Sequence, residues 1–159
     1  PMPFSKVRSI LEEEWGPDGF ALFADIEEET LGAASLGQVH KGRLQDGRHV
    51  AIKVQYPGIR DSLEGDLSQL KRLLSINPVA NIRKQANAYI EELRERFLLE
   101  SDYREELQNL RDGAELFAFI PDLVIPKGVA ELTTSKVLVM EQLEGVPLLD
   151  AFELSLIHI

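Results

Sequence analysis

The stretch Val50-Ala51-Ile52-Lys53-Val54-Gln55-Tyr56-Pro57-Gly58 decides the fold of this chain. Its first part reads as a β-strand, and Pro57-Gly58 ends that strand. Just before it, Asp46-Gly47 is a dipeptide that two-residue hairpin turns favour. The pattern therefore predicts antiparallel strands over about 38–44 and 48–55, joined by a tight turn.

Val50-Ala51-Ile52-Lys53 is also a full match to V-A-I-K, the sequence on the strand that carries the phosphate-binding lysine of protein kinases. Upstream, residues 32–39 (Gly-Ala-Ala-Ser-Leu-Gly-Gln-Val) fit the kinase template G-x-G-x-x-G-x-V, except that Ala34 replaces the middle glycine. Small residues there let backbone N–H groups approach phosphate oxygens. We therefore predict a nucleotide site in which Lys53 holds the α- and β-phosphates of ATP.

Simpler explanations compete with this one. Small residues between strands are often only a turn, and a lysine at a strand end is usually solvated. The order of turn, hairpin and V-A-I-K nevertheless favours the nucleotide site. A dinucleotide-binding fold would also explain the glycines, but it needs a helix that opens from them. The residues after Gly37 predict a strand instead, so we reject that fold.

The rest of the chain predicts further strands and helices. Residues 4–14 predict a short amphipathic helix that Gly16-Pro17 ends. The expected strands are 27–33, 38–44, 48–55, 123–130 and 136–142, with helices between 61 and 117 that are interrupted near Asn77-Pro78. This order predicts an α+β fold, with a five-stranded antiparallel sheet and helices on one side of it.

The clearest helical pattern lies near the end of the helical region. One apolar stripe recurs every three or four residues: Leu99, Tyr103, Leu107, Leu110, Ala114 and Phe117. Beside it, Asp102, Glu106 and Asn109 share a face. A kinase lysine needs a carboxylate from the helix called αC, and Glu106 is a better candidate than the acidic residues between 61 and 66. A solvated acidic face explains the same pattern equally well.

Residues 137–145 (Val-Leu-Val-Met-Glu-Gln-Leu-Glu-Gly) fit a strand that runs into a kinase hinge. Backbone groups of such a hinge bond the adenine, and Met140 takes the position that borders the base. The predicted catalytic residues are Lys53 and Glu106. The predicted nucleotide-contacting residues are Gly32, Ala33, Ala34, Ser35, Gly37, Val39, Ala51, Lys53, Met140 and Glu141.

Composition excludes several classes of function. The net charge of −10 argues against a nucleic-acid binder, which needs clustered Lys and Arg. The absence of cysteine excludes disulfides, thiol catalysis and Cys-based zinc sites. His40, His49 and His158 lack a metal-ligand spacing, and no apolar run approaches the roughly 18 residues of a membrane span.

Together these motifs resemble the UbiB family of atypical kinases, over residues 1 to about 150. The resemblance rests on residues 31–40, residues 50–58 and the pattern Glu100-Ser101-Asp102-Tyr103…Glu106…Asn109. It implies a protein-kinase-like small lobe with extra helices before αC. It also implies ATP as the nucleotide, Mg²⁺ in the full-length protein, and an ATPase-like role in ubiquinone or other prenyl-quinone biosynthesis.

The resemblance implies roles for single residues as well. Lys53 matches the family's ATP-phosphate lysine, and Glu106 matches its αC partner. Residues 33–35 match an alanine-rich loop, which is expected to be stiffer than a glycine loop because each Cβ restricts φ. Glu100 and Asp102 match an E-x-D motif with a regulatory role, which faces an upstream K-x-G-Q element in the family.

The chain also departs from the family pattern. Gly32 stands where better-known members have alanine, which leaves the preference between ATP and ADP open. The expected domain is a truncated small lobe over 1–150 that ends at the hinge, with 151–159 as a non-native tail. Both termini are expected to be artificial, with the catalytic Asp and Asn and the metal-binding D-F-G beyond Ile159. This piece alone is therefore expected to be inactive.

Two other functions stay open, the small lobe of a conventional Ser/Thr protein kinase and a non-catalytic pseudokinase scaffold. The expected partners are a nucleotide and, for the parent protein, lipids, quinone-pathway proteins or a membrane surface, but no nucleic acid. The sequence leaves the compartment open. A eukaryotic parent would be mitochondrial or plastid, and a bacterial one cytoplasmic or membrane-associated.

Overall fold

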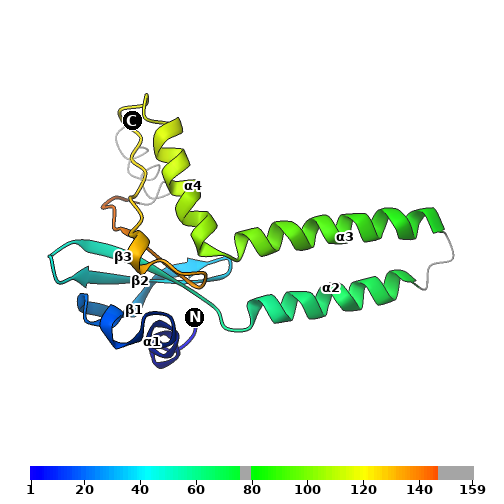
Figure 1. The fold of residues 1–159 in the computed structure, drawn as a ribbon, viewed down its shortest axis with the longest axis horizontal. Helices are drawn as coiled ribbons and strands as arrows, with labels where there is room; N and C mark the ends of the chain where they lie inside the picture. The colour runs from blue at the N-terminus through cyan, green and yellow to red at the C-terminus, as the bar shows by residue number, and fades with distance from the viewer. Residues whose placement is uncertain (76–79, 147–159) are drawn as a thin grey trace, which may run out of the picture.

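The computed structural model describes the backbone of residues 1–75 and 80–146, and the side chains of 1–74 and 84–146. In this part of the chain, one antiparallel sheet has the order β1 (Phe23–Ala34), β2 (Gly37–Leu44), β3 (His49–Gln55) and β4 (Val137–Glu141). The helices are α1 (Phe4–Phe20), α2 (Ile59–Ser75), α3 (Ala80–Glu100), α4 (Tyr103–Leu116) and the 3-10 helix η1 (Ala130–Leu132), as Figure 1 shows. The predicted α+β class is confirmed.

The predicted fifth strand over 123–130 was wrong, because the described sheet has four strands. In its place, Gly128 makes an isolated bridge to Met140, flanked by two hydrogen bonds of 2.8 Å. Pro126 lies just before the bridge and has no N–H to donate to a ladder. After the bridge the chain coils into η1, so the pairing stays too short to form a strand.

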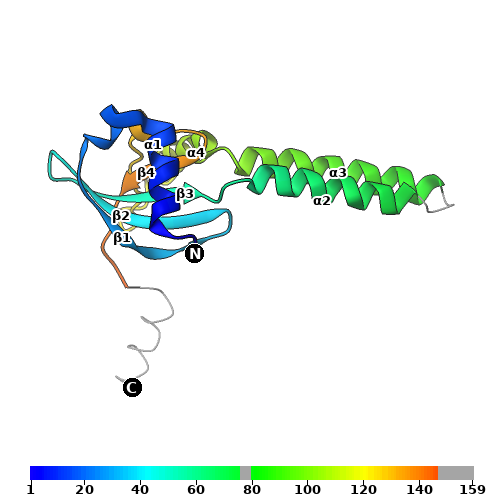
Figure 2. The same ribbon diagram turned by 90° about the horizontal axis from the view of Figure 1, so that it is seen from below.

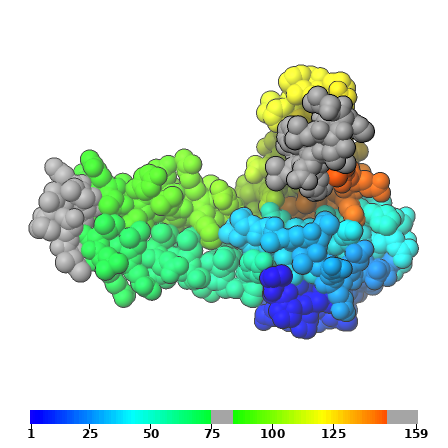
Figure 3. All heavy atoms as spheres, turned by 180° about the vertical axis from the view of Figure 1, so that it is seen from behind, coloured from blue at the N-terminus to red at the C-terminus, as the bar shows by residue number. Residues whose placement is uncertain are grey.

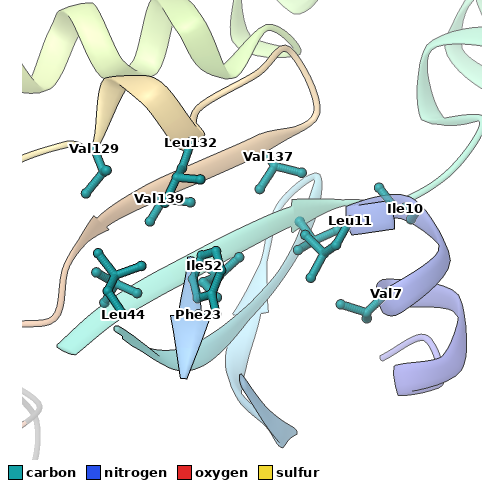
Figure 4. Packing of buried hydrophobic residues seen from close by; sticks show 12 residues of the cluster. Val7, Ile10, Leu11, Phe23, Leu44, Ile52, Val129, Leu132, Val137 and Val139 are labelled. Carbon is teal, nitrogen blue, oxygen red and sulfur yellow. The ribbon is translucent and has the colours of Figure 1, made fainter. Parts of the chain in front are cut away.

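The two faces of the sheet carry different helices. Val50, Ile52 and Val54 of β3 join a buried cluster with α1, which Figure 4 shows from close by. The intervening Lys53 reaches α4 on the opposite face. The expectation of helices on one side only was therefore wrong: α1 and α4 cover opposite faces (Figure 1). The alternation of side chains along a strand explains this, because both faces of β3 need cover.

Helix α1 runs beyond its predicted end at Gly16-Pro17. Gly16 adopts φ 63° and kinks the helix, which then continues to Phe20. Pro17 begins the second piece, where its missing N–H and fixed φ suit the first turn of a helix. Just before the kink, the indole of Trp15 stacks on Phe23 at 4.8 Å and donates to the Leu132 carbonyl at 2.8 Å. These contacts hold α1 on the sheet.

Helix α4 begins at Tyr103, after a break that follows the end of α3 at Glu100. The predicted apolar stripe ran through this break as if the helix were continuous. The Asp102 carboxylate accepts a hydrogen bond from the Arg104 backbone N–H at 3.0 Å and caps the helix. Leu99 therefore belongs to α3 and is 60% exposed. Of the other stripe residues, Tyr103 and Leu107 are buried with Leu138, Leu110 and Met140 pack beside them, and Ala114 and Phe117 are exposed.

Helices α2 and α3 form the predicted extra segment before α4. They pack against each other and project from the sheet as a hairpin, seen from two sides in Figures 1 and 2 and as a solid arm in Figure 3. Leu67 and Ile90 are buried, and the ion pair Glu64–Arg94 spans the two helices at 2.8 Å. The predicted interruption near Asn77-Pro78 and the tail at 151–159 lie outside the described residues.

No helix in the described ranges combines the length and the apolar character that crossing a bilayer requires.

Candidate functional site

The site is centred on an ion pair between β3 and α4. The Lys53 Nζ lies 2.7 Å from both carboxylate oxygens of Glu106, fifty-three residues later in the chain. The two side chains are 16% and 36% exposed, so the lysine is largely enclosed while the carboxylate borders an opening. A hydrogen bond between two charged groups in such a setting is stronger than one on the open surface. The pair fixes the position of the ammonium group.

Tyr103 encloses the same lysine from a second side. The Lys53 ammonium lies 4.8 Å from the centre of the Tyr103 ring, a cation–π distance. Tyr103 and Glu106 are three residues apart on α4, so they project from neighbouring positions on one side of that helix. Burial, with a smaller contribution from the Glu106 charge, raises the pKa of the Tyr103 hydroxyl well above its ordinary value. The phenol therefore stays neutral beside the ion pair.

The small-residue segment forms the β1–β2 hairpin above the lysine. Gly32, Ala33 and Ala34 pair with Val39, Gln38 and Gly37, so Ser35 and Leu36 form the connecting turn. Most of the predicted loop is therefore strand. In the next ladder, Val39 pairs with Lys53 and thus lies on the face of the lysine.

A pocket of about 350 Å³ lies between this turn and α4. Its lining residues are Ser35, Leu36, Lys53, Leu99, Glu100, Tyr103, Glu105, Glu106 and Asn109. One cation beneath a turn with small residues suits a phosphate group, because both the ammonium and backbone N–H groups can donate to its oxygens. The carboxylates at the rim disfavour a bare polyanion, so a phosphate chain here calls for a counter-cation.

The described residues show no ready cation site. Among the described side chains, those of residues 1–74 and 84–146, no three or more from His, Asp or Glu gather in a way that could hold a metal ion. The acidic residues that line the pocket are Glu100, Glu105 and Glu106.

The predicted adenine-side residues lie farther along β3 and β4. Ala51 pairs with Met140, on the face of the sheet that also carries Lys53. Met140 is partly buried against the Tyr103–Leu107–Leu138 cluster. Glu141 is exposed, and its side chain accepts a hydrogen bond of 3.4 Å from the Lys127 backbone N–H. None of the three lines the pocket around Lys53.

The two acids of the E-x-D motif face different hollows. Glu100 lines the pocket with Lys53. Asp102 caps α4 and borders another cavity of about 450 Å³, shared with Arg60, Glu95 and Glu105 among others. Of the three residues predicted to share a face, Glu106 and Asn109 line the pocket with Lys53. Asp102 does not, because it caps the start of α4 and borders the other cavity.

Two features, one in the site and one behind it, were missed by sequence reasoning. Tyr103 counted as a member of the apolar stripe and of the family pattern but not as a site residue, although its spacing from Glu106 was a usable signal. The second is a buried network on the opposite face of the sheet from Lys53. The Gln38 amide bonds the backbone N–H and carbonyl of Met2 at 2.7 and 3.2 Å and contacts the His40 ring at 2.8 Å. No local motif marked Gln38, because its partner lies 36 residues away.

The chain is similar to known proteins over most of its length. It is 38% identical over 147 residues to "Atypical kinase COQ8B, mitochondrial" of Rattus norvegicus, covering 92% of this chain and 28% of that protein. It is 36% identical over 153 residues to "Uncharacterized aarF domain-containing protein kinase At1g71810, chloroplastic" of Arabidopsis thaliana, covering 95% and 22%. The chain thus spans less than a third of these relatives.

A solved structure and a family model are also similar to this chain. The structure of Rv3197 in complex with erythromycin, from Mycobacterium tuberculosis, is 35% identical with a TM-score of 0.79, and the match covers 96% of this chain and 39% of that one. The model of the ABC1 atypical kinase-like domain matches residues 1–159. These matches confirm the predicted resemblance to UbiB-type atypical kinases, and the chain belongs to the ABC1 atypical kinase-like family.

Proposed function

We propose that residues 1–150 form the nucleotide-binding small lobe of a UbiB-type atypical kinase or ATPase. The observation that carries the proposal is the Lys53–Glu106 ion pair, 2.7 Å long, in a pocket beneath the Ser35-Leu36 turn. A positioned ammonium group is what the α- and β-phosphates of ATP require. Lys53 would bind the phosphates, Glu106 would orient Lys53, and residues 32–37 would cover them.

The base would lie toward the other end of the sheet. Ala51 and Met140 form an adjacent pair on the Lys53 face. They would form the apolar wall against the adenine, and the backbone around Glu141 would bond its edge. Mg²⁺ would accompany the nucleotide and offset the charge of Glu100 and Glu105, with ligands from elsewhere in the parent protein.

The direct test is nucleotide binding and ATP hydrolysis by the full-length protein that carries this chain. Lys53→Ala and Glu106→Gln are each expected to weaken ATP binding by at least about tenfold, since each removes a charge-assisted contact, and to abolish turnover. Lys136→Ala is the matched control. It removes a lysine that is also ion-paired, to Glu13 and Glu14 on α1, and that does not line the pocket. Wild-type turnover in Lys53→Ala would refute the assigned role.

The wider role that we propose for the parent protein is support of ubiquinone or other prenyl-quinone biosynthesis. This proposal is supported by the family to which the chain belongs. A strain without the parent protein is expected to lose prenyl-quinone, and the wild-type gene to restore it. The Lys53→Ala gene should fail to do so. Rescue by Lys53→Ala would separate the quinone role from nucleotide binding.

A further inference from the structure

A buried hydroxyl group at the pocket lacks a partner. Tyr103 is 1% exposed, and its Oη has no hydrogen-bond partner among the described residues. The Arg60 Nε shares this condition, but Arg60 still donates through Nη2 to the Ser101 carbonyl at 2.6 Å. The hydroxyl of Tyr103 is the one polar group of its side chain. Buried polar groups are almost always paired in native proteins, so this hydroxyl calls for an explanation.

The hydroxyl lies directly below the β1–β2 turn. A Cβ atom on Gly37 would come within 3.0 Å of the hydroxyl oxygen, which places that oxygen against the backbone where the turn ends. The Tyr103 ring meanwhile lies under the Lys53 ammonium at 4.8 Å. The phenol thus spans the floor of the pocket between the lysine and the turn, and it is one of the lining residues.

The hairpin above the hydroxyl is irregular on its β1 side. The β1–β2 ladder has register shifts between Ile26 and Thr30 and between Thr30 and Gly32. Leu31 lies within the second irregular step and is 51% exposed, and Ser35 at the hairpin tip is exposed as well. The β1 strand of this hairpin is thus attached through an interrupted ladder, whereas β2, which carries Gly37, pairs with β3 in continuous register. The parts free to move away from the phenol are therefore β1 and the Ser35-Leu36 turn, while β2 stays in place.

We propose that the Tyr103 hydroxyl donates a hydrogen bond to a phosphate oxygen of the nucleotide held between Lys53 and the Ser35-Leu36 turn. This inference rests on the proposed nucleotide function and adds a binding residue to that site. The phosphate supplies the acceptor that the protein lacks, and the turn moves to admit it. The phenol suits this task because its raised pKa keeps the proton on the oxygen at neutral pH.

The test is Tyr103→Phe in the full-length protein, because it removes one oxygen and keeps the ring. Binding of ATP, tripolyphosphate and adenosine is measured by calorimetry. Loss of a hydrogen bond to a charged oxygen predicts about tenfold weaker binding of ATP and tripolyphosphate, with adenosine unchanged. The melting temperature without ligand should stay the same or rise, since the variant deletes an unpaired buried group.

Tyr89→Phe serves as the control, because Tyr89 is 65% exposed on α3 and should leave all three affinities unchanged. Wild-type ATP affinity in Tyr103→Phe would overturn the inference, as would an equal loss for adenosine. If the wild-type protein bound neither ATP nor tripolyphosphate, the nucleotide function itself would fail. The two failures are therefore distinguishable.

Discussion

At the level of single residues, the start of β2 leaves no room for a side chain. A Cβ atom on Gly37 would lie 2.2 Å from the Val54 carbonyl oxygen, closer than any real contact. Gly37→Ala should therefore force the β2–β3 ladder apart and lower the free energy of unfolding by about 2 kcal/mol. Urea denaturation measures the change.

Gly32→Ala is the matched control in the same hairpin. No atom lies within 4 Å of the position of its Cβ, and the backbone of Gly32 does not adopt positive φ. Alanine should therefore leave the stability unchanged or raise it by up to about 1 kcal/mol through the unfolded state. Equal destabilisation by the two substitutions would contradict the steric argument.

The contact between Lys53 and Glu106 was within reach of the sequence, because a strand motif and a helical face each marked one partner. Their roles toward a nucleotide stay predictions. Tyr103 was harder to identify as a site residue, since an aromatic residue on an apolar stripe is usually core and only its spacing from Glu106 marked it. It is in fact both, because its ring packs with Leu107 and Leu138 while Lys53 lies over its face.

At the level of elements, the segment before α1 is fastened to the sheet through one side chain. Gln38 of β2 is 1% exposed, and its amide satisfies both backbone groups of Met2. Gln38→Met keeps the size of the side chain but removes the hydrogen-bond partner of those two backbone groups and of the His40 Nε2. We expect a loss of about 2 kcal/mol in the free energy of unfolding, with faster amide hydrogen exchange over residues 2–7.

Gln45→Met provides the comparison for that prediction. Gln45 also donates to a backbone carbonyl, that of Phe23 at 3.1 Å, but it is exposed to solvent. Water can replace its hydrogen bond, so a change within about 0.5 kcal/mol is expected. A Gln38→Met protein as stable as this control would show that the Met2 segment contributes little.

Among the elements, those with local signals were predicted best. The strands β2, β3 and β4 begin and end within one residue of expectation, since hairpin signals and alternation define them. The strand over 123–130 was wrong because its apolar run satisfied the pattern while Pro126 and η1 limited its pairing. The break before α4 was missed, although Asp102 is a favoured N-cap residue.

At the level of the whole molecule, acid should loosen α1 from the sheet. Burial alone would raise the pKa of Glu14, but hydrogen bonds with Thr134 and Lys136 lower it below the ordinary 4.5. A carboxyl group with a lowered folded-state pKa stabilises the fold above its unfolded pKa, and this contribution is lost as the pH falls through the folded value. The α1 attachment should therefore weaken below about pH 4.5.

The single tryptophan, Trp15, reports on this attachment because it lies next to Glu14 and bonds the Leu132 carbonyl. Its fluorescence should shift to the red as the pH falls through that range. Lys136→Met should lower the free energy of unfolding at pH 7 by about 0.5 to 1 kcal/mol and flatten the acid response. An unchanged response in Lys136→Met would assign the acid transition to other carboxylates.

One register of strand β3 serves both the hydrophobic core and the binding site. Val50, Ile52 and Val54 belong to the buried cluster with α1, while Lys53 between them reaches Glu106. If the register of β3 slipped by one residue, the Lys53 ammonium would point into the hydrophobic core and Ile52 would point toward the ligand. A single substitution in β3 can therefore change the core face or the binding face without affecting the other. An insertion or deletion within β3 would disrupt the hydrophobic core and the binding site together.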